Sequence, residues 1–186
     1  VVSEGRRHPD AIEHIYRMIN GIEGFLKETI LDFAEVLPGE KLDGLKSTPG
    51  AYLGSCRYKL PESLEDPVYP KLFKKFEEMN IGWFFYIGGN DSMDTVSKLS
   101  RYAEKIGSDI RVIGEPKTID NDLVHTDHTP GFGSAARYVA STVREITIDA
   151  NVYEKKSVTI IEIMGRHAGW LTAASALARK YTGDNP

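Results

Sequence analysis

The chain has 186 residues, of which 41 % are hydrophobic and 27 % charged, and its formal net charge is −4. These proportions are typical of a globular protein, and the length suffices for one α/β core or for one domain and part of a second. A negative net charge argues against a broad nucleic-acid surface, which needs clustered lysine and arginine. The longest apolar stretches are too short to span a bilayer, and no signal peptide is visible. Cys56 is the single cysteine, which excludes an internal disulfide and favours a reducing, cytoplasmic environment.

The first third of the chain predicts short elements. Residues 12–18 are expected to form a short strand or the end of a helix, and residues 21–26 a turn. Residues 40–45 are a short helix candidate, which Thr48-Pro49-Gly50 would end because proline and glycine both stop helices. The stretch 60–70 is rich in proline and acidic residues, so it is expected to be a loop.

From there on, helical and strand patterns alternate. Apolar residues at helical spacing predict helices over residues 69–79, 92–106, 133–150 and 167–181. Short apolar runs predict strands over residues 81–87, 110–113 and 157–164. The first of these runs is fully apolar, so it is expected to be covered on both faces, with Trp83 and residues 84–86 in the core. The third is also expected to be buried.

This alternation, without hairpin signals, predicts the fold class: an α/β protein with a doubly wound, mainly parallel sheet. In such sheets ligands bind beyond the carboxyl ends of the strands. Three predicted strands end next to residues that can carry chemistry, namely Gly88, Lys117 and Gly165.

Gly88 and Gly89 follow the first of these strands directly. Two glycines let the backbone approach a ligand, and the helix that follows offers free N–H groups to an anion. The alternative is a plain tight turn with Asp91 or Ser92 as the helix N-cap. Asp91 is unexpected in a phosphate site, since its carboxylate would repel a phosphate docked there; it favours a smaller or differently placed anion.

The segment from Lys117 to Asp122 is more specific. In an extended chain Thr118, Asp120 and Asp122 would point the same way. One carboxylate could then accept a proton from an attacking hydroxyl while the other anchors Mg²⁺. Lys117, together with Arg57, would offset the negative charge of a phosphoryl group in transfer. The alternative is an Asx-turn that merely caps the next segment.

Two further segments contain residues that could bind a ligand. Met164-Gly165-Arg166 ends the third predicted strand, where glycine allows backbone approach and arginine offers a fork suited to phosphate. A surface arginine at a strand end is the simpler alternative. His125 and His128 have a spacing that can hold a transition metal on a helix, but the surrounding residues predict a loop, so contact with substrate or solvent is favoured.

At these residues the chain resembles the phosphofructokinase family, and most closely its pyrophosphate-dependent branch. The matching strings occur in the family's order: Thr48-Pro49-Gly50, Leu53-Gly54-Ser55-Cys56-Arg57, residues 88–94, residues 116–123, Thr129-Pro130-Gly131-Phe132-Gly133 and residues 161–170. The resemblance implies two doubly wound α/β lobes with the active site between them. It also implies Mg²⁺-dependent phosphoryl transfer from pyrophosphate to the 1-hydroxyl of fructose 6-phosphate, a reversible step of glycolysis.

The resemblance assigns roles to individual residues. Asp120 matches the general base, and Arg57 resembles the arginine that touches the phosphoryl group. The sugar phosphate would be bound by two segments: Thr118, Ile119 and Asp120, and Met164, Gly165 and Arg166. Asn90 stands where many members have a metal-linked Asp, so Asn90 and Asp122 are the expected metal residues.

Donor choice is expected to depend on Asp91 and Lys117, because ATP-using relatives carry glycine at both places. The carboxylate of Asp91 would occupy the position of a nucleotide α-phosphate and repel it. Lys117, with Gly88 and Gly89, would hold pyrophosphate. The Asp91 carboxylate and the Lys117 ammonium are therefore expected to lie close to each other.

The chain departs from the family at both ends, since no Gly-rich phosphate loop precedes Val1 and the sequence stops at Pro186. Residues 1–130 are expected to be most of the first lobe and residues 131–186 the opening helix–strand–helix of the second. A fragment of this kind would be inactive alone and, at full length, would form a homo-oligomer. Alternatives are an ATP-dependent enzyme and a non-catalytic phosphate-binding regulatory homologue. A nicotinamide dehydrogenase is disfavoured because no Gly-x-Gly-x-x-Gly opens a helix.

Overall fold

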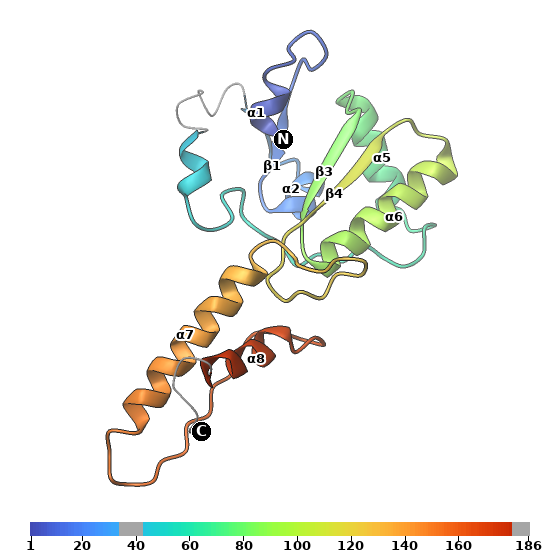
Figure 1. Ribbon diagram of the computed structural model, residues 1–186. Coiled ribbons are helices and arrows are strands. Elements are labelled where there is room, and N and C mark those ends of the chain that lie inside the picture. Colours follow the sequence, from blue (N-terminus) through green and yellow to red (C-terminus); the bar gives the residue numbers. More distant parts are fainter. Residues whose placement is uncertain (34–42, 180–186) are drawn as a thin grey trace. The chain divides into compact units, whose positions relative to one another are not determined.

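The structure, a computed structural model, describes residues 1–33 and 43–179 (Figure 1). These residues form two units. The first contains Val1–Gly82 and Tyr102–Asp109, and the second contains Trp83–Arg101 and the chain from Ile110 onward. None of the helices in the described ranges is long and apolar enough to cross a membrane.

The first unit is built from short elements and one longer helix. They are α1 (Val2–Gly5), β1 (Tyr16–Met18), α2 (Gly21–Leu26), β2 (Ile30–Asp32), the 3₁₀ helix η1 (Leu45–Ser47) and α5 (Val68–Glu78). β1 pairs antiparallel with β2, with Tyr16 opposite Asp32, so this pair is the antiparallel part of a fold that the sequence predicted to be mainly parallel. The short strand expected within residues 12–18 is confirmed as β1. Residues 40–42 of the helix candidate at residues 40–45 lie outside the described residues, and residues 43–45 are helical.

The turn predicted at residues 21–26 is wrong, because these residues form α2. Asn20 precedes the helix in the left-handed conformation, with φ of 61°. Gly24 lies directly on the backbone of the preceding residues: a Cβ there would be 1.6 Å from the carbonyl oxygen of Ile19. The glycine therefore serves close packing of α2 rather than a turn.

Aromatic rings form the core of the first unit. α5 has its predicted helical pattern and buries Tyr69, Leu72, Phe73 and Phe76. The Phe76 ring centroid is 4.9 Å from that of Phe25 on α2, and the Tyr69 ring is stacked 5.1 Å from Tyr102. Aromatic rings at these separations stabilise a fold by more than the burial of their apolar area alone. Helix α5 and Tyr102 are thereby fixed by packing in this unit.

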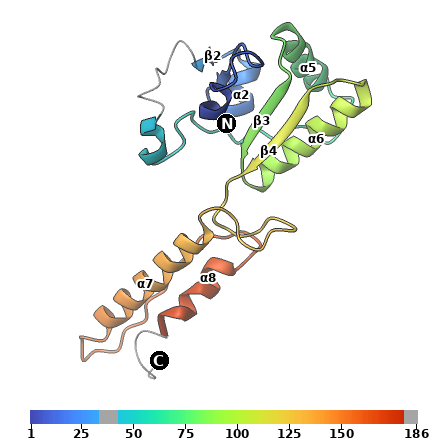
Figure 2. The ribbon, with the colours of Figure 1, turned by 45° about the horizontal axis from the view of Figure 1, so that its top comes forward.

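The second unit contains the parallel strands that the sequence predicted. β3 (Trp83–Gly88) pairs in parallel with β4 (Arg111–Pro116), and α6 (Asn90–Ile106) connects them along the chain. The two strands lie side by side in Figure 2. Met93 and Val96 of α6 lie against Gly114 of β4, where a Cβ would be 2.8 Å from the Met93 sulfur. α7 (Phe132–Ala150) follows, and α8 (Trp170–Ala174) and the 3₁₀ helix η2 (Ser175–Ala178) pack against it.

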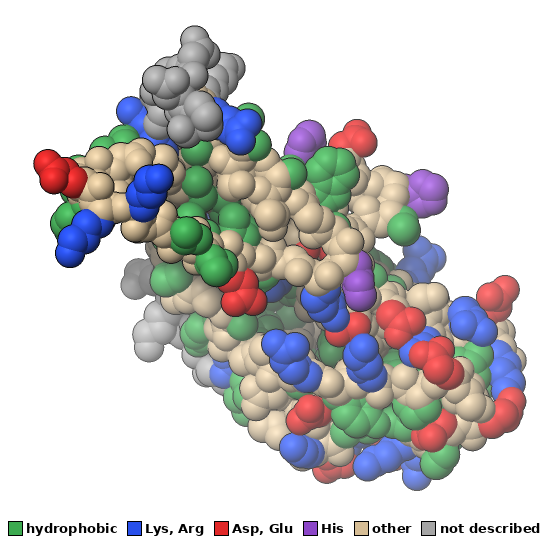
Figure 3. All heavy atoms as spheres, turned by 90° about the horizontal axis from the view of Figure 1, so that it is seen from below, with side chains coloured by type: hydrophobic (Ala, Val, Ile, Leu, Met, Phe, Trp, Pro, Cys, Tyr) green, Lys and Arg blue, Asp and Glu red, His purple; other side chains and the backbone are tan. Residues whose placement is uncertain are grey.

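The expectation that β3 is covered on both faces is wrong. Phe84 is only 2 % exposed, but Trp83 is 50 % and Ile87 58 % exposed. Side chains of a strand alternate between faces, so one face of β3 is buried and the other is open. Hydrophobic side chains at the surface are also visible, as green spheres among charged ones, in Figure 3.

The third buried strand, predicted at residues 157–164, is also wrong. These residues have no regular secondary structure, and Val158 and Ile160 are 90 % and 91 % exposed. The strand pairs among the described residues are β1–β2 and β3–β4, so this run has no neighbour with which to form a ladder. An apolar run becomes a strand only when another strand satisfies its backbone groups. The helix predicted over 167–181 is confirmed from Trp170 to Ala178 by α8 and η2, while residues 167–169 are not helical.

Candidate active site

The carboxyl ends of β3 and β4 meet within the second unit. Gly88 pairs with Pro116, and the backbone N–H of Lys117 donates to the carbonyl oxygen of Gly88 at 2.7 Å. A Cβ on Gly89 would be 3.8 Å from both the Lys117 carbonyl oxygen and the Thr118 Cβ. The structure therefore brings together the two segments that the sequence singled out, as parallel pairing requires.

Gly88 has no room for a side chain. A Cβ at this position would be 2.0 Å from the Ser92 hydroxyl oxygen and 2.6 Å from the Ser92 Cβ. Turning the hydroxyl away cannot relieve the second contact, because it involves the atom nearest the backbone. The glycine thus permits α6 to begin immediately after β3.

Gly88→Ala is expected to lower the free energy of unfolding by about 1–3 kcal/mol, the usual cost of an added methyl group in filled space. Urea denaturation followed by circular dichroism measures it. Gly133→Ala is the matched control, because nothing lies within 4 Å of a Cβ there and the position is in helix α7. The control should be as stable as the wild type or more stable. Equal stability of the Gly88 variant and the wild type would contradict the packing argument.

Helix α6 begins at this junction. It starts at Asn90 with Asp91 in its first turn, and the N–H groups of Ser92 and Met93 donate to the Gly89 carbonyl oxygen, both at 3.0 Å. Asp91 and Ser92 are therefore inside the first turn rather than at the N-cap. The first N–H groups of an α-helix have no partner within the helix, so this end can bind an anion.

Asp120 and Asp122 each bury one carboxylate oxygen without a partner. The Oδ1 atoms of both residues are inaccessible to solvent and form no hydrogen bond. The other oxygen of Asp122 accepts a hydrogen bond of 2.6 Å from the Asn90 side-chain amide. An unpaired buried oxygen is costly, and the cost is relieved by a bound cation or a proton donor.

These residues fit a magnesium ion. No group of three or more Asp, Glu, His or Cys residues that could hold a metal occurs within the described ranges. Mg²⁺ is commonly held by one or two carboxylates, with water and substrate phosphates completing its coordination. The free Asp122 oxygen beside Asn90 matches that need. Within the described ranges, neither His125 nor His128 belongs to such a group. His128 instead stacks on Phe132, with ring centroids 5.8 Å apart.

The segment from Thr118 to Asp122 is not extended, contrary to expectation. The Thr118 hydroxyl accepts a hydrogen bond of 3.1 Å from the Asp120 backbone N–H, and Asn121 is left-handed with φ of 56°. The two aspartates therefore lie in a bend of the backbone. The turn that the sequence analysis gave as the alternative is present, and the unpaired carboxylate oxygens occur within it. Asn121 had no assigned role in the sequence analysis; the only available signal is the tolerance of asparagine for left-handed backbone.

Arg166 reaches the first turn of α6. Its Nη1 atom is 3.6 Å from Oδ2 of Asp91, with both side chains about half exposed. Gly165 makes this approach possible, because its φ is 149° and a Cβ would be 2.7 Å from the Ala168 carbonyl oxygen. Met164 beside it is exposed.

The expected pairing of Asp91 with Lys117 is not what the structure shows. The Lys117 side chain is exposed and takes part in none of the ion pairs found among the described residues. The cation close to Asp91 is Arg166. Arg57, an exposed residue, belongs to the first unit, so its contact with a phosphoryl group stays a prediction.

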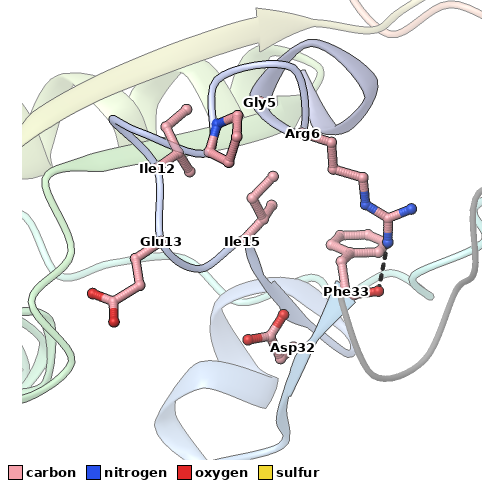
Figure 4. Close-up of a pocket in the computed structure, with 8 residues that line it drawn as sticks. Gly5, Arg6, Ile12, Glu13, Ile15, Asp32 and Phe33 are labelled. Atoms are coloured by element: carbon pink, nitrogen blue, oxygen red, sulfur yellow. Dashed lines mark hydrogen bonds between the residues drawn. The ribbon is translucent and has the colours of Figure 1, made fainter.

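The first unit has a separate cavity of about 170 Å³. It is lined by Gly5, Arg6, Pro9, Ile12, Glu13, Ile15, Asp32 and Phe33. Figure 4 shows Arg6 donating to the Phe33 carbonyl oxygen, at 2.7 Å. None of the residues predicted to form the site lines this cavity, so it does not compete with the strand ends as the candidate site.

Comparison with known proteins decides the family. The sequence matches the family described as Phosphofructokinase over residues 3–182, which is nearly the whole chain. The chain belongs to the phosphofructokinase family. The α/β fold class is thereby confirmed.

Several relatives of this phosphofructokinase chain carry the name of a pyrophosphate-dependent enzyme. It is 42 % identical to the pyrophosphate–fructose 6-phosphate 1-phosphotransferase of Halomonas elongata, over 100 % of the chain and 45 % of the relative. The enzyme of that name from Methylococcus capsulatus is 43 % identical over 96 % of the chain and 43 % of the relative. The crystal structure of the pyrophosphate-dependent phosphofructokinase from Marinobacter aquaeolei matches with a TM-score of 0.82 and 44 % identity, over 96 % of the chain and 44 % of that structure. The chain therefore spans less than half the length of these relatives.

Proposed function

We propose that this chain is part of an enzyme that transfers a phosphoryl group from pyrophosphate to the 1-hydroxyl of fructose 6-phosphate. The observation that carries the proposal is the pair of buried, unpartnered carboxylate oxygens of Asp120 and Asp122 at the junction of β3, β4 and α6. One carboxylate is available to accept a proton and the other to bind a cation. Phosphoryl transfer to a hydroxyl needs both a general base and a bound cation.

In this mechanism Asp120 is the general base. Its carboxylate accepts the proton of the sugar 1-hydroxyl while the hydroxyl oxygen forms a bond to a phosphorus atom of pyrophosphate. The bond from that phosphorus to the bridging oxygen breaks, and inorganic phosphate leaves. Thr118 and Ile119, with Met164, Gly165 and Arg166, orient the sugar phosphate.

The charge of the donor is neutralised from several directions. Asp122 and Asn90 would hold Mg²⁺, which when bound screens the negative charge of pyrophosphate. Lys117 and the glycines Gly88 and Gly89 bind pyrophosphate at the start of α6, where free N–H groups favour an anion. Arg57 stabilises the phosphoryl group in transfer.

Asp91 sets the donor in this proposal. Its carboxylate stands in the first turn of α6, where an additional nucleotide phosphate would meet a like charge. The Nη1 atom of Arg166 lies 3.6 Å from this carboxylate. Arg166 thus links donor choice to the segment that binds the sugar phosphate.

The rest of the proposal concerns the whole protein. Residues 1–130 would belong to the first lobe and residues 131–186 to the second, in a cytoplasmic homo-oligomer acting in glycolysis. The partners would be fructose 6-phosphate and pyrophosphate, with no role for nucleic acid or a membrane.

Steady-state assays of the full-length protein with fructose 6-phosphate and Mg²⁺ test the function. The expected result is a much higher kcat/KM with pyrophosphate than with ATP. Efficient use of ATP would make the protein an ATP-dependent enzyme and overturn the role of Asp91. Calorimetric binding of both substrates without product would instead indicate a regulatory homologue.

A further inference from the structure

Asn121 is buried between the two aspartates of the site. The residue is only 9 % exposed, and its backbone is left-handed with φ of 56°. Its side-chain amide donates to the Asp127 carbonyl oxygen at 3.1 Å, and its side-chain oxygen accepts from the Thr129 N–H at 2.8 Å. One side chain therefore closes the whole loop from residue 121 to residue 129.

The far end of this loop is itself fixed. Thr129 is 3 % exposed, and its carbonyl oxygen accepts from the Phe132 N–H at 3.1 Å, at the start of α7. Gly131, the N-cap of α7, has φ of 89°, and a Cβ there would be 3.1 Å from the Ile119 side chain. The beginning of α7 therefore contacts the same short segment that carries Asp120.

A carboxylate with an unpaired oxygen has little to fix its position. The backbone N–H of Asp120 donates to the Thr118 hydroxyl, and one carboxylate oxygen of Asp122 accepts from the Asn90 amide. The Oδ1 atom of each aspartate has no partner. Their backbone must therefore be held by neighbours. The residue between them holds it, through two hydrogen bonds that cross six and eight positions of the chain.

We propose that Asn121 is a positioning residue, whose side-chain amide clamps the 121–129 loop and thereby fixes the carboxylates of Asp120 and Asp122 for phosphoryl transfer. Only a side chain with a donor and an acceptor on one carbon can make both bonds at this reach. Aspartate keeps the acceptor but places a charge against the Asp127 carbonyl oxygen. The consequence for turnover rests on the proposed function; the clamp itself does not.

Asn121→Gly is the decisive variant, since glycine adopts the left-handed backbone without strain and removes both side-chain bonds. Asn80→Gly is the matched control. Asn80 is also left-handed, with φ of 51°, but it is exposed and lies after α5 in the first unit. The control therefore makes the same substitution at a similar left-handed backbone conformation, at a position without the clamp.

Two readouts are measured on the full-length protein. Amide hydrogen exchange at Thr129 should accelerate by at least about tenfold in Asn121→Gly, because its acceptor is removed, and stay unchanged in Asn80→Gly. With pyrophosphate as donor, kcat should fall roughly 10- to 100-fold, the usual loss when reacting groups are misplaced by about 1 Å. The KM for fructose 6-phosphate should stay within about threefold, and the control should keep wild-type kinetics.

The outcomes separate the clamp from the proposed function. Unchanged Thr129 exchange in Asn121→Gly would overturn the clamp. Faster exchange with wild-type kcat would overturn its positioning role. A wild-type protein that transfers no phosphoryl group would reject the proposed function, yet the exchange experiment would still decide whether Asn121 holds the loop.

Discussion

Asp120→Ser is expected to lower kcat by about 10²- to 10⁴-fold, with little change in the KM for fructose 6-phosphate. Serine retains a small polar side chain but cannot accept a proton at neutral pH. The buried Oδ1 of Asp120 has no partner within the protein, so the substitution breaks no internal hydrogen bond of that atom. The loss should therefore appear in the chemical step.

Asp127→Ser is the matched control for this variant, because it removes the same charge from the same loop. The Asp127 side chain is exposed, and only its backbone carbonyl takes part in the Asn121 contact. Steady-state kinetics of the full-length protein with pyrophosphate should show wild-type turnover for the control. A kcat of Asp120→Ser within about threefold of the wild type would remove the base assignment.

The second large effect is expected at the donor site. Asp91→Gly should raise kcat/KM with ATP by about 10²-fold or more, because placing like charges together costs several kcal/mol. The variant also frees Arg166, whose guanidinium lies 3.6 Å from the Asp91 carboxylate. Part of the gain is expected only with Lys117→Gly added, since Lys117 is proposed to bind pyrophosphate at the start of α6.

Asp94→Gly is unsuitable as a control because Asp94 pairs with the buried Lys98 at 2.7 Å, so Asp91→Asn serves better. Asparagine removes the charge and keeps the volume, which separates repulsion from bulk. Donor competition assays with ATP and pyrophosphate measure the shift. If the Asp91 and Lys117 double glycine variant still excludes ATP, another element sets donor choice.

The elements that the sequence predicted well owe their structure to local patterns. The apolar spacing of α5 and α7 requires no knowledge of partners, and the short run at β4 is sufficient to mark a strand. Residues 157–164 have an equally apolar run, but a strand also needs a neighbour, and none of the described residues supplies one. The turn predicted at residues 21–26 was wrong for a different reason: Gly24 packs closely against Ile19, and no local pattern reveals such a contact.

In the candidate site, too, some features could be predicted from local patterns and others depend on contacts between residues distant in the sequence. That Gly88 and Lys117 lie together could be predicted, because parallel strands end at the same edge. The partner of Asp91 could not, since the approach of Arg166 depends on the unusual backbone of Gly165. The role of Asn121 depends on a loop that returns eight residues later to Thr129, and such closure is visible only in three dimensions.

The most direct test of pyrophosphate-dependent transfer uses labelled donor. The full-length protein is incubated with ³²P-labelled pyrophosphate, Mg²⁺ and fructose 6-phosphate, and the sugar bisphosphate is isolated by chromatography. Label should appear in fructose 1,6-bisphosphate from pyrophosphate, and γ-labelled ATP should give almost none. Label that enters the sugar equally well from ATP, or that appears only as free phosphate, would contradict the account.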